Sequence, residues 1–163
     1  CNGSLIRPGM AVMVDMCGNF TGYMTDMTRV YSGGELPDLA HRAHQCSIDI
    51  HRAVSQMGKP GVKAADLYNL AMSIAKEAGL GNYFMGHTQK AGFIGHGVGI
   101  EVNEAPVLAP RSKDILEGNQ VIALEPKFVI PHVGAVGIED TYTVTPEGMK
   151  AITNAPIEIV SLS

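Results

Sequence analysis

Two pairs of acidic residues in the sequence have the spacing of a divalent metal centre. Asp15 and Asp26 are the second and the last residue of the segment VDMCGNFTGYMTD, and Glu125 and Glu139 bracket a second segment of similar design. In an antiparallel hairpin, the position numbers of cross-strand partners add up to a constant. The midpoint of each acid pair falls in a stretch that is typical of a turn. We therefore expect each hairpin to hold its two acids directly opposite each other, with Cβ atoms about 5 Å apart.

Such an arrangement places like charges face to face, which is unfavourable in a sheet. The acids are flanked by apolar residues that indicate partial burial, namely Val12, Val14, Ile122 and Leu124. One proton shared by each pair would relieve the repulsion. A divalent cation is the stronger candidate, because it would neutralise both pairs at once.

His96 is the candidate nitrogen ligand. It lies in the segment IGHGVG, where glycines on both sides allow the close backbone approach that a tight site requires. Four carboxylates and one imidazole form a hard, oxygen-rich set that suits two Mn, Co, Fe or Zn ions bridged by carboxylates. Two ions about 3.5–4 Å apart can activate a shared water and polarise a carbonyl.

The other histidines have weaker claims to a role in the site. His41, His44 and His51 are expected on the solvated face of a helix. His87 lies in a long Gly-rich segment and could contact a substrate, whereas His132 is expected in a turn.

These residues need strands and loops to position them. We expect strands at residues 11–14 and 22–31 with turn chemistry at Gly18-Asn19, and further strands within residues 119–148. Apolar residues at helical spacing predict one helix from Pro37-Asp38 to Gly58 and another that Gly79 ends. Residues 79–99 form a candidate functional loop.

Composition sets the broad class. The 163 residues are enough for one domain, and 45% apolar with 17% charged residues is typical of a soluble globular protein. A net charge of −4 argues against nucleic-acid partners, and no apolar run approaches the about 20 residues that span a membrane. Cys1, Cys17 and Cys46 show no paired spacing, so we expect packing roles or chance occurrence, and a cytoplasmic location. The absence of an initial Met suggests a piece of a longer protein.

Four motifs together resemble the pita-bread metallopeptidases, a group that includes Xaa-Pro dipeptidase (prolidase), aminopeptidase P and methionine aminopeptidase. The motifs are VDMCGNFTGYMTDMTRVY, FIGHGVGIEVNEAP, ALEP and GIEDTYTVTPEG, and DMTRVY resembles the prolidase and aminopeptidase P branch. The resemblance implies an α+β pita-bread fold, with a curved antiparallel sheet and helices on its outer face. Residues 1–163 would be the C-terminal part of the catalytic domain, with the preceding part absent.

The resemblance also implies a ligand set and an activity. Two divalent ions, Mn or Co before Zn or Fe, would support hydrolysis of short peptides, with Xaa-Pro dipeptides as the expected substrates. Asp26 and Glu139 would bridge the two ions, and Glu125 would accept the proton of the attacking water. The implied metal ligands are Asp15, Asp26, His96, Glu125 and Glu139.

The sequence departs from the family pattern at two positions. Asn103 stands where active members carry a second histidine, and Gly92 stands where some prolidases carry another. An asparagine can donate a hydrogen bond to a reacting carbonyl, but it cannot carry a proton at neutral pH. Because an incomplete core would expose apolar surface, we also expect a homodimer or association with the missing N-terminal part.

Two other functions fit the same fold. The first is a non-catalytic pita-bread module that binds peptides or proteins, which Asn103 favours. The second is a creatinase-like enzyme that uses no metal. The complete set of ligands argues against both.

Overall fold

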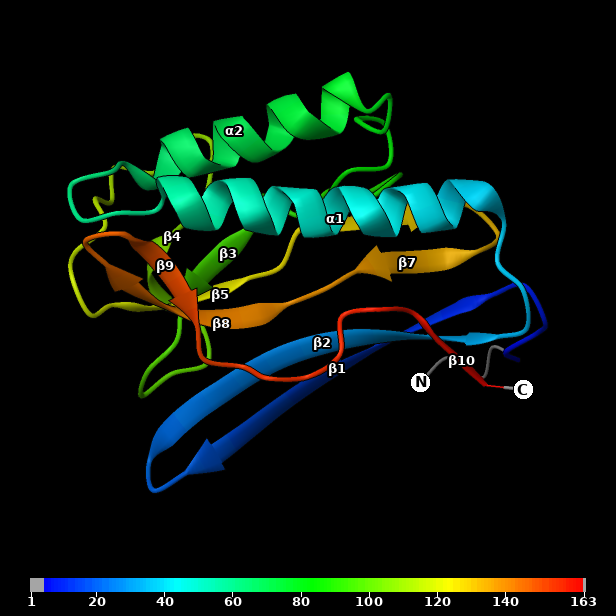
Figure 1. The fold of residues 1–163 in the computed structure, drawn as a ribbon, viewed down its shortest axis with the longest axis horizontal. Helices are drawn as coiled ribbons and strands as arrows, with labels where there is room; N and C mark the ends of the chain where they lie inside the picture. The colour runs from blue at the N-terminus through cyan, green and yellow to red at the C-terminus, as the bar shows by residue number, and fades with distance from the viewer. Residues whose placement is uncertain (1–4, 163) are drawn as a thin grey trace.

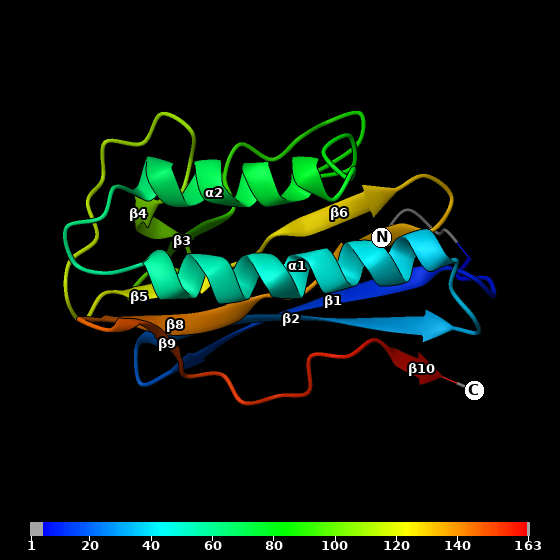
Figure 2. The same cartoon turned by 45° about the horizontal axis from the view of Figure 1, so that its top comes forward.

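The computed structural model describes residues 5–162. The two helices lie on one side of the strands (Figures 1 and 2). Cys1, for which a packing role was expected, lies outside the described residues. The elements in chain order are β1 Ala11–Phe20, β2 Tyr23–Gly33, α1 Asp38–Met57, α2 Ala64–Glu77, β3 Gly95–Gly97, β4 Glu104–Val107, β5 Val121–Leu124, β6 Lys127–Ile130, β7 Gly134–Gly137, β8 Asp140–Thr145, β9 Gly148–Ala151 and β10 Val160–Leu162.

The turn of the β1–β2 hairpin lies at Thr21-Gly22, and the sequence prediction of a turn at Gly18-Asn19 is wrong. Thr21 and Gly22 have positive φ angles of 52° and 89°. The side chain of Asn19 accepts a hydrogen bond from the backbone N–H of Gly22 at 3.1 Å, which stabilises this turn. The strands are consequently longer than expected.

This turn changes which residues face each other across the hairpin. Asp15 pairs with Thr28, and Asp26 pairs with Cys17, so the prediction that the two aspartates are direct partners is wrong by two positions. A shift of two positions preserves the face from which each side chain projects. Asp15, Cys17, Asp26 and Thr28 therefore share one face of the hairpin.

The second pair of acids has the predicted register. β5 pairs with β8 and β6 pairs with β7, and the partner numbers of both ladders add up to the same constant as 125 and 139 do. Glu125 and Glu139 lie at the break between these two ladders. The two ladders together form one long hairpin, with β5 and β6 in one arm and β7 and β8 in the other. At its break β2 meets this long hairpin, where Thr28 of β2 forms a single antiparallel β-bridge with Glu139.

The core lies between the helices and the strands. α1 packs on β6, β7 and β9, and α2 packs against α1, while the β1–β2 hairpin extends on the opposite side (Figure 1). Ile50 and Val54 of α1 are fully buried, and the ring centroids of Phe84 and Phe128 lie 5.2 Å apart in the same core. β10 pairs with β2 in parallel, which is an exception to the expected antiparallel pairing. Neither α1 nor α2 combines the length and apolarity that crossing a membrane requires.

The bounds of α1 agree with the predicted helix, but the prediction of a solvated histidine face is wrong for two residues. His44 and His51 are buried, whereas His41 is exposed. His51 lies 2.8 Å from the hydroxyl of Tyr142 and 3.0 Å from the carbonyl oxygen of Ile138. These partners are distant in the sequence, so helical periodicity could not reveal them.

Candidate metal centre

Four of the five predicted ligands are buried and converge where β2, β3 and the break in the long hairpin meet. The relative exposure is 5% for Asp26, 3% for His96, 8% for Glu125 and 3% for Glu139. Nε2 of His96 lies 3.5 Å from Oε1 of Glu125 and 3.7 Å from Oδ2 of Asp26. The potential ligand atoms of Asp26, His96 and Glu139 all lie within 4.8 Å of one another.

Asp15, the fifth predicted ligand, is exposed and belongs to a second group. Its carboxylate, the sulfur of Cys17 and the carboxylate of Asp26 also lie within 4.8 Å of one another. Asp26 is the member that the two groups share. Two adjacent ion positions with Asp26 between them are compatible with this arrangement.

The position of His96 depends on the glycines beside it. β3 lies between β4 and β5, and a Cβ atom added at Gly95 would collide with the carbonyl oxygen of Ala123. A Cβ atom added at Gly97 would collide with the carbonyl oxygen of Ala105. The expectation of close backbone approach around His96 is confirmed.

The imidazole of His96 is oriented for ligation. Nδ1 lies 3.1 Å from the carbonyl oxygen of Gly97, to which it can donate a hydrogen bond. That tautomer leaves the lone pair of Nε2 directed toward the carboxylates, as in many histidine metal ligands. Burial lowers the pKa of His96, because it disfavours the charged imidazolium. The interactions with Glu125 and with the carbonyl oxygen of Gly97 outweigh burial and raise the pKa of His96 overall.

For two of the carboxylates, the nearby positive charge and hydrogen bonds do not compensate for burial. Burial raises the pKa of Asp26 above its usual range, and the charges of Asp15 and Glu125 add to the rise. Burial, with the charges of Glu125 and Asp26, raises the pKa of Glu139 to about 7, although a hydrogen bond from Thr28 opposes the rise. Divalent cations would supply the missing charge, so the residues present fit a metal centre.

Glu125 differs because a lysine accompanies it. Burial alone would raise its pKa, but the neighbouring His96 and Lys127 outweigh burial and hold the pKa of Glu125 below its usual range. The ammonium of Lys127 forms an ion pair with Oε2 of Glu125. Sequence reasoning missed this lysine, although two residues separated by one position on an extended chain project from the same face.

Side chains adjacent to the predicted ligands hold the acidic strands together, and no role was predicted for them. Thr28 donates a hydrogen bond of 2.6 Å to Oε2 of Glu139, and Thr141 donates one of 2.7 Å to the backbone carbonyl of Asp26. Arg29 forms a buried ion pair of 2.6 Å with Asp140. The available signal was their position in the motifs DMTRVY and IEDTY, beside the predicted ligands.

Asn103 is exposed in the loop between β3 and β4. Two hydrogen bonds attach this loop to the start of β2. The hydroxyl of Tyr23 donates to the carbonyl oxygen of Val98 at 3.0 Å, and the backbone N–H of Met24 donates to the carbonyl oxygen of Gly99 at 2.8 Å. His87 is also exposed and stacks on Tyr83, with ring centroids 6.3 Å apart. Neither Asn103 nor His87 belongs to the two groups of potential ligands.

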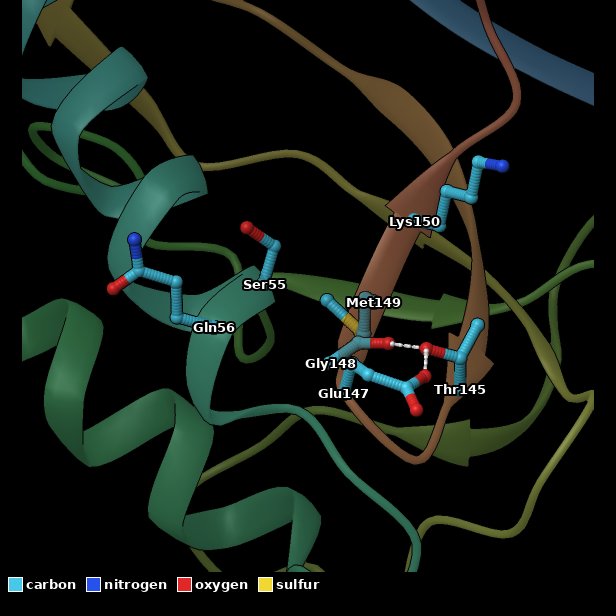
Figure 3. A pocket seen from close by; sticks show the side chains of 7 residues that line it. All are labelled: Ser55, Gln56, Thr145, Glu147, Gly148, Met149 and Lys150. Atoms are coloured by element: carbon cyan, nitrogen blue, oxygen red, sulfur yellow. Dashed lines mark hydrogen bonds between the residues drawn. The ribbon is translucent and has the colours of Figure 1, made fainter.

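A hollow of about 350 Å³ lies elsewhere, between the end of α1 and the β8–β9 turn (Figure 3). Within it the hydroxyl of Thr145 donates to the carbonyl oxygen of Gly148 at 2.7 Å. No predicted metal ligand lines this hollow. Its lining residues are Ser55, Gln56, Thr145, Glu147, Gly148, Met149 and Lys150.

Comparison with known proteins assigns the chain to a family. The sequence pattern of metallopeptidase family M24 matches residues 1–146. The chain belongs to metallopeptidase family M24. The predicted membership of the pita-bread metallopeptidases is thereby confirmed.

Individual M24 relatives agree with this assignment. The chain is 32% identical over 155 residues to a Xaa-Pro dipeptidase of Pyrococcus furiosus, covering 95% of the chain and 43% of the relative. It is 35% identical over 158 residues to an uncharacterized peptidase of Bacillus subtilis, covering 97% of the chain and 43% of the relative. The solved Xaa-Pro dipeptidase of Bacillus anthracis is 33% identical, with a TM-score of 0.86 over 98% of the chain and 43% of that structure.

The structural likeness confirms the pita-bread fold. The chain spans about 43% of the length of these relatives.

Proposed function

We propose that this chain carries the metal centre of a dinuclear metallopeptidase that hydrolyses short peptides, with Xaa-Pro dipeptides as the substrate class. The observation that carries the proposal is the convergence of buried Asp26, His96 and Glu139, whose potential ligand atoms lie within 4.8 Å of one another. Asp26 also belongs to the adjacent group with Asp15. M24 membership supports a metal-dependent peptidase, and the names of the Pyrococcus and Bacillus anthracis relatives support the choice of Xaa-Pro substrates.

In this proposal five residues hold two divalent ions, with Mn or Co preferred and Zn or Fe as alternatives. Bound ions would supply the positive charge that activates water and polarises the scissile carbonyl. Asp26 belongs to both groups of potential ligands, and the family resemblance implies that Asp26 and Glu139 would both be shared by the ions. Thr28 fixes one oxygen of Glu139 by its 2.6 Å hydrogen bond. The ligands would be Asp15, Asp26, His96, Glu125 and Glu139.

Glu125 is the proposed proton acceptor. The Lys127 ion pair and the proximity of His96 keep its carboxylate ionised, as a proton acceptor requires. Asn103 is a candidate donor to the reacting carbonyl, because its loop is attached to β2 close to Asp26. Its amide can donate a hydrogen bond without exchanging a proton.

The direct test combines metal analysis with peptide hydrolysis. The full-length protein that contains these residues is loaded with Mn²⁺ or Co²⁺ and assayed on Xaa-Pro dipeptides and on matched Xaa-Ala dipeptides. Hydrolysis that requires metal and prefers proline is the expected result. A full-length protein that binds no metal, or that hydrolyses neither peptide with Mn²⁺, Co²⁺, Zn²⁺ or Fe²⁺, would contradict the proposal.

Asp26→Asn separates the enzyme from the alternative of a non-catalytic peptide-binding module. An enzyme should lose metal and turnover, whereas a binding module should retain its affinity for peptide. Asp49→Asn is the matched control, because Asp49 is exposed on α1. The single-domain organisation, the association with a second copy or a preceding segment, and the cytoplasmic location stay predictions.

A further inference from the structure

The corrected register of the β1–β2 hairpin places Cys17, rather than Asp15, directly opposite Asp26. The sulfur of Cys17 lies 3.2 Å from Oδ1 of Asp26 and 3.9 Å from Oδ1 of Asp15. All three potential ligand atoms lie within 4.8 Å of one another. The thiol of Cys17 therefore lies where a metal ligand would lie, in the group that Asp26 forms with Asp15 rather than in the group that it forms with His96 and Glu139.

We propose that Cys17 is an additional metal ligand, whose thiolate joins Asp15 and Asp26 and biases this ion position toward thiophilic cations such as Zn²⁺, Cd²⁺ and Co²⁺ over Mn²⁺. The inference rests on the proposed function, because it concerns the same metal centre. It adds a ligand that the family resemblance does not include, and with it a preference among metals.

The distances suit a thiolate-containing site. A tetrahedral zinc ion with Zn–S of about 2.3 Å and Zn–O of about 2.1 Å separates its sulfur and oxygen ligands by about 3.6 Å. The observed separations of 3.2 Å and 3.9 Å lie on either side of this value. A thiolate is a soft ligand that zinc and cadmium accept readily, whereas manganese prefers oxygen.

The two described cysteines, Cys17 and Cys46, have different surroundings, which favour a ligand role for Cys17 and a packing role for Cys46. Cys46 is buried among apolar residues of the core, as the sequence analysis expected. Cys17 is exposed, and its side chain contacts the carboxylates of Asp15 and Asp26. The exposure of Cys17 therefore excludes a packing role in the core.

Charge is balanced in the proposed centre. As the sulfur–metal bond forms, the thiol releases its proton to solvent, which adds one negative charge to those of the four carboxylates. Two divalent ions neutralise the carboxylates, and the ammonium of Lys127 beside Glu125 offsets the thiolate. Lys127 thus supplies a positive charge that a centre of carboxylates and imidazole alone would not need.

The test is spectroscopic and needs no turnover. The full chain is titrated with Co²⁺ and then with Cd²⁺, in the original form and as Cys17→Ser. The original chain should show an ultraviolet thiolate-to-metal charge-transfer band, and Cys17→Ser should lose it while keeping the visible bands of bound Co²⁺. Cys46→Ala and Cys1→Ser are matched controls that should keep the charge-transfer band.

Affinity provides the second readout. Calorimetric titration should show that Cys17→Ser lowers the ratio of Cd²⁺ to Mn²⁺ affinity by at least about tenfold. Co²⁺ binding without a charge-transfer band, or an unchanged affinity ratio, would overturn the role of Cys17 and leave the proposed peptidase intact. Failure of the original chain to bind any of these ions would overturn both proposals.

Discussion

Arg29 and Asp140 form a buried ion pair, with 2.6 Å between Nη2 of Arg29 and Oδ1 of Asp140. Each of them directly follows a member of the hydrogen-bonded pair Thr28 and Glu139. The exposed fraction of these side chains is 5% and 9%. Arg29 also donates through Nη1 to the carbonyl oxygens of Thr28 and Glu139, each at 2.8 Å. The guanidinium therefore joins the strand that bears Asp26 to the chain that bears Glu139.

Replacing this guanidinium should destabilise the fold. Arg29→Met leaves the Asp140 carboxylate buried with the Thr153 hydrogen bond but without an opposite charge, so we expect a loss of about 3–5 kcal/mol in the free energy of unfolding. Urea denaturation measures the loss. Arg52→Met is the control, because the Arg52–Asp49 pair has exposed fractions of 66% and 50% and should contribute at most about 1 kcal/mol. Equal losses in both variants would show that the buried pair has no special role.

The glycine after His96 should be intolerant of a methyl group. Gly97→Ala directs a Cβ atom at the carbonyl oxygen of Ala105, so β3 and β4 must separate and His96 must move. We expect a loss of about 1–3 kcal/mol in stability and weaker metal binding, measured by denaturation and calorimetry. Gly92→Ala is the control, since its Cβ atom would meet nothing within 4 Å. A Gly97→Ala variant with unaltered stability would contradict the close approach.

Metal stoichiometry should distinguish the two aspartates. Asp26 belongs to both groups of potential ligands and Asp15 to one, so Asp26→Asn should abolish binding of both ions, whereas Asp15→Asn should retain the ion at His96 and Glu139. Inductively coupled plasma mass spectrometry after Mn²⁺ loading and desalting measures the content. Identical metal content in the two variants would argue against Asp26 as the shared ligand.

His51 should make the stability of the metal-free protein sensitive to pH. Complete burial lowers the pKa of His51 from 6.5 to about 4, so the folded imidazole stays neutral where the unfolded one is protonated. Its contribution to stability is present above pH 6.5 and is lost as the pH falls toward 4, on the order of 3 kcal/mol across the window.

The comparison variant for this prediction is His51→Gln, measured by urea denaturation at several pH values. Glu139, whose pKa is raised to about 7, acts in the opposite direction in part of the same window, but it acts in both proteins. The difference between the two stability profiles should therefore isolate His51. Parallel profiles would show that His51 does not titrate as its burial requires.

Several features of the protein follow from local sequence. The period of apolar residues in α1, with Pro37 before it and Gly58 after it, fixes the bounds of this helix because these signals act within one or two turns. The glycines beside His96 indicate close backbone approach for a similarly local reason. The register of Glu125 and Glu139 also follows, since the turn around His132 defines their hairpin.

The register of the other hairpin could not be read from the sequence. The predicted pairing of Asp15 with Asp26 centres the turn on Phe20-Thr21, and the observed turn at Thr21-Gly22 shifts each partner by two positions, which leaves every side chain on the same face. Alternation therefore carries no information that separates the two registers. The hydrogen bond from Gly22 to Asn19 belongs to the observed turn, which places Cys17 opposite Asp26.

The sequence by itself determined the family and the two helices and predicted the five candidate ligands, because each depends on residue types at short spacing. Only the tertiary structure decided which groups surround them. Lys127 at Glu125, Cys17 at Asp26 and Arg29 at Asp140 are contacts set by strand register and by the packing of distant segments. Burial and charge in the centre depend on those contacts, since desolvation and Coulomb energy follow distance in space rather than separation along the chain.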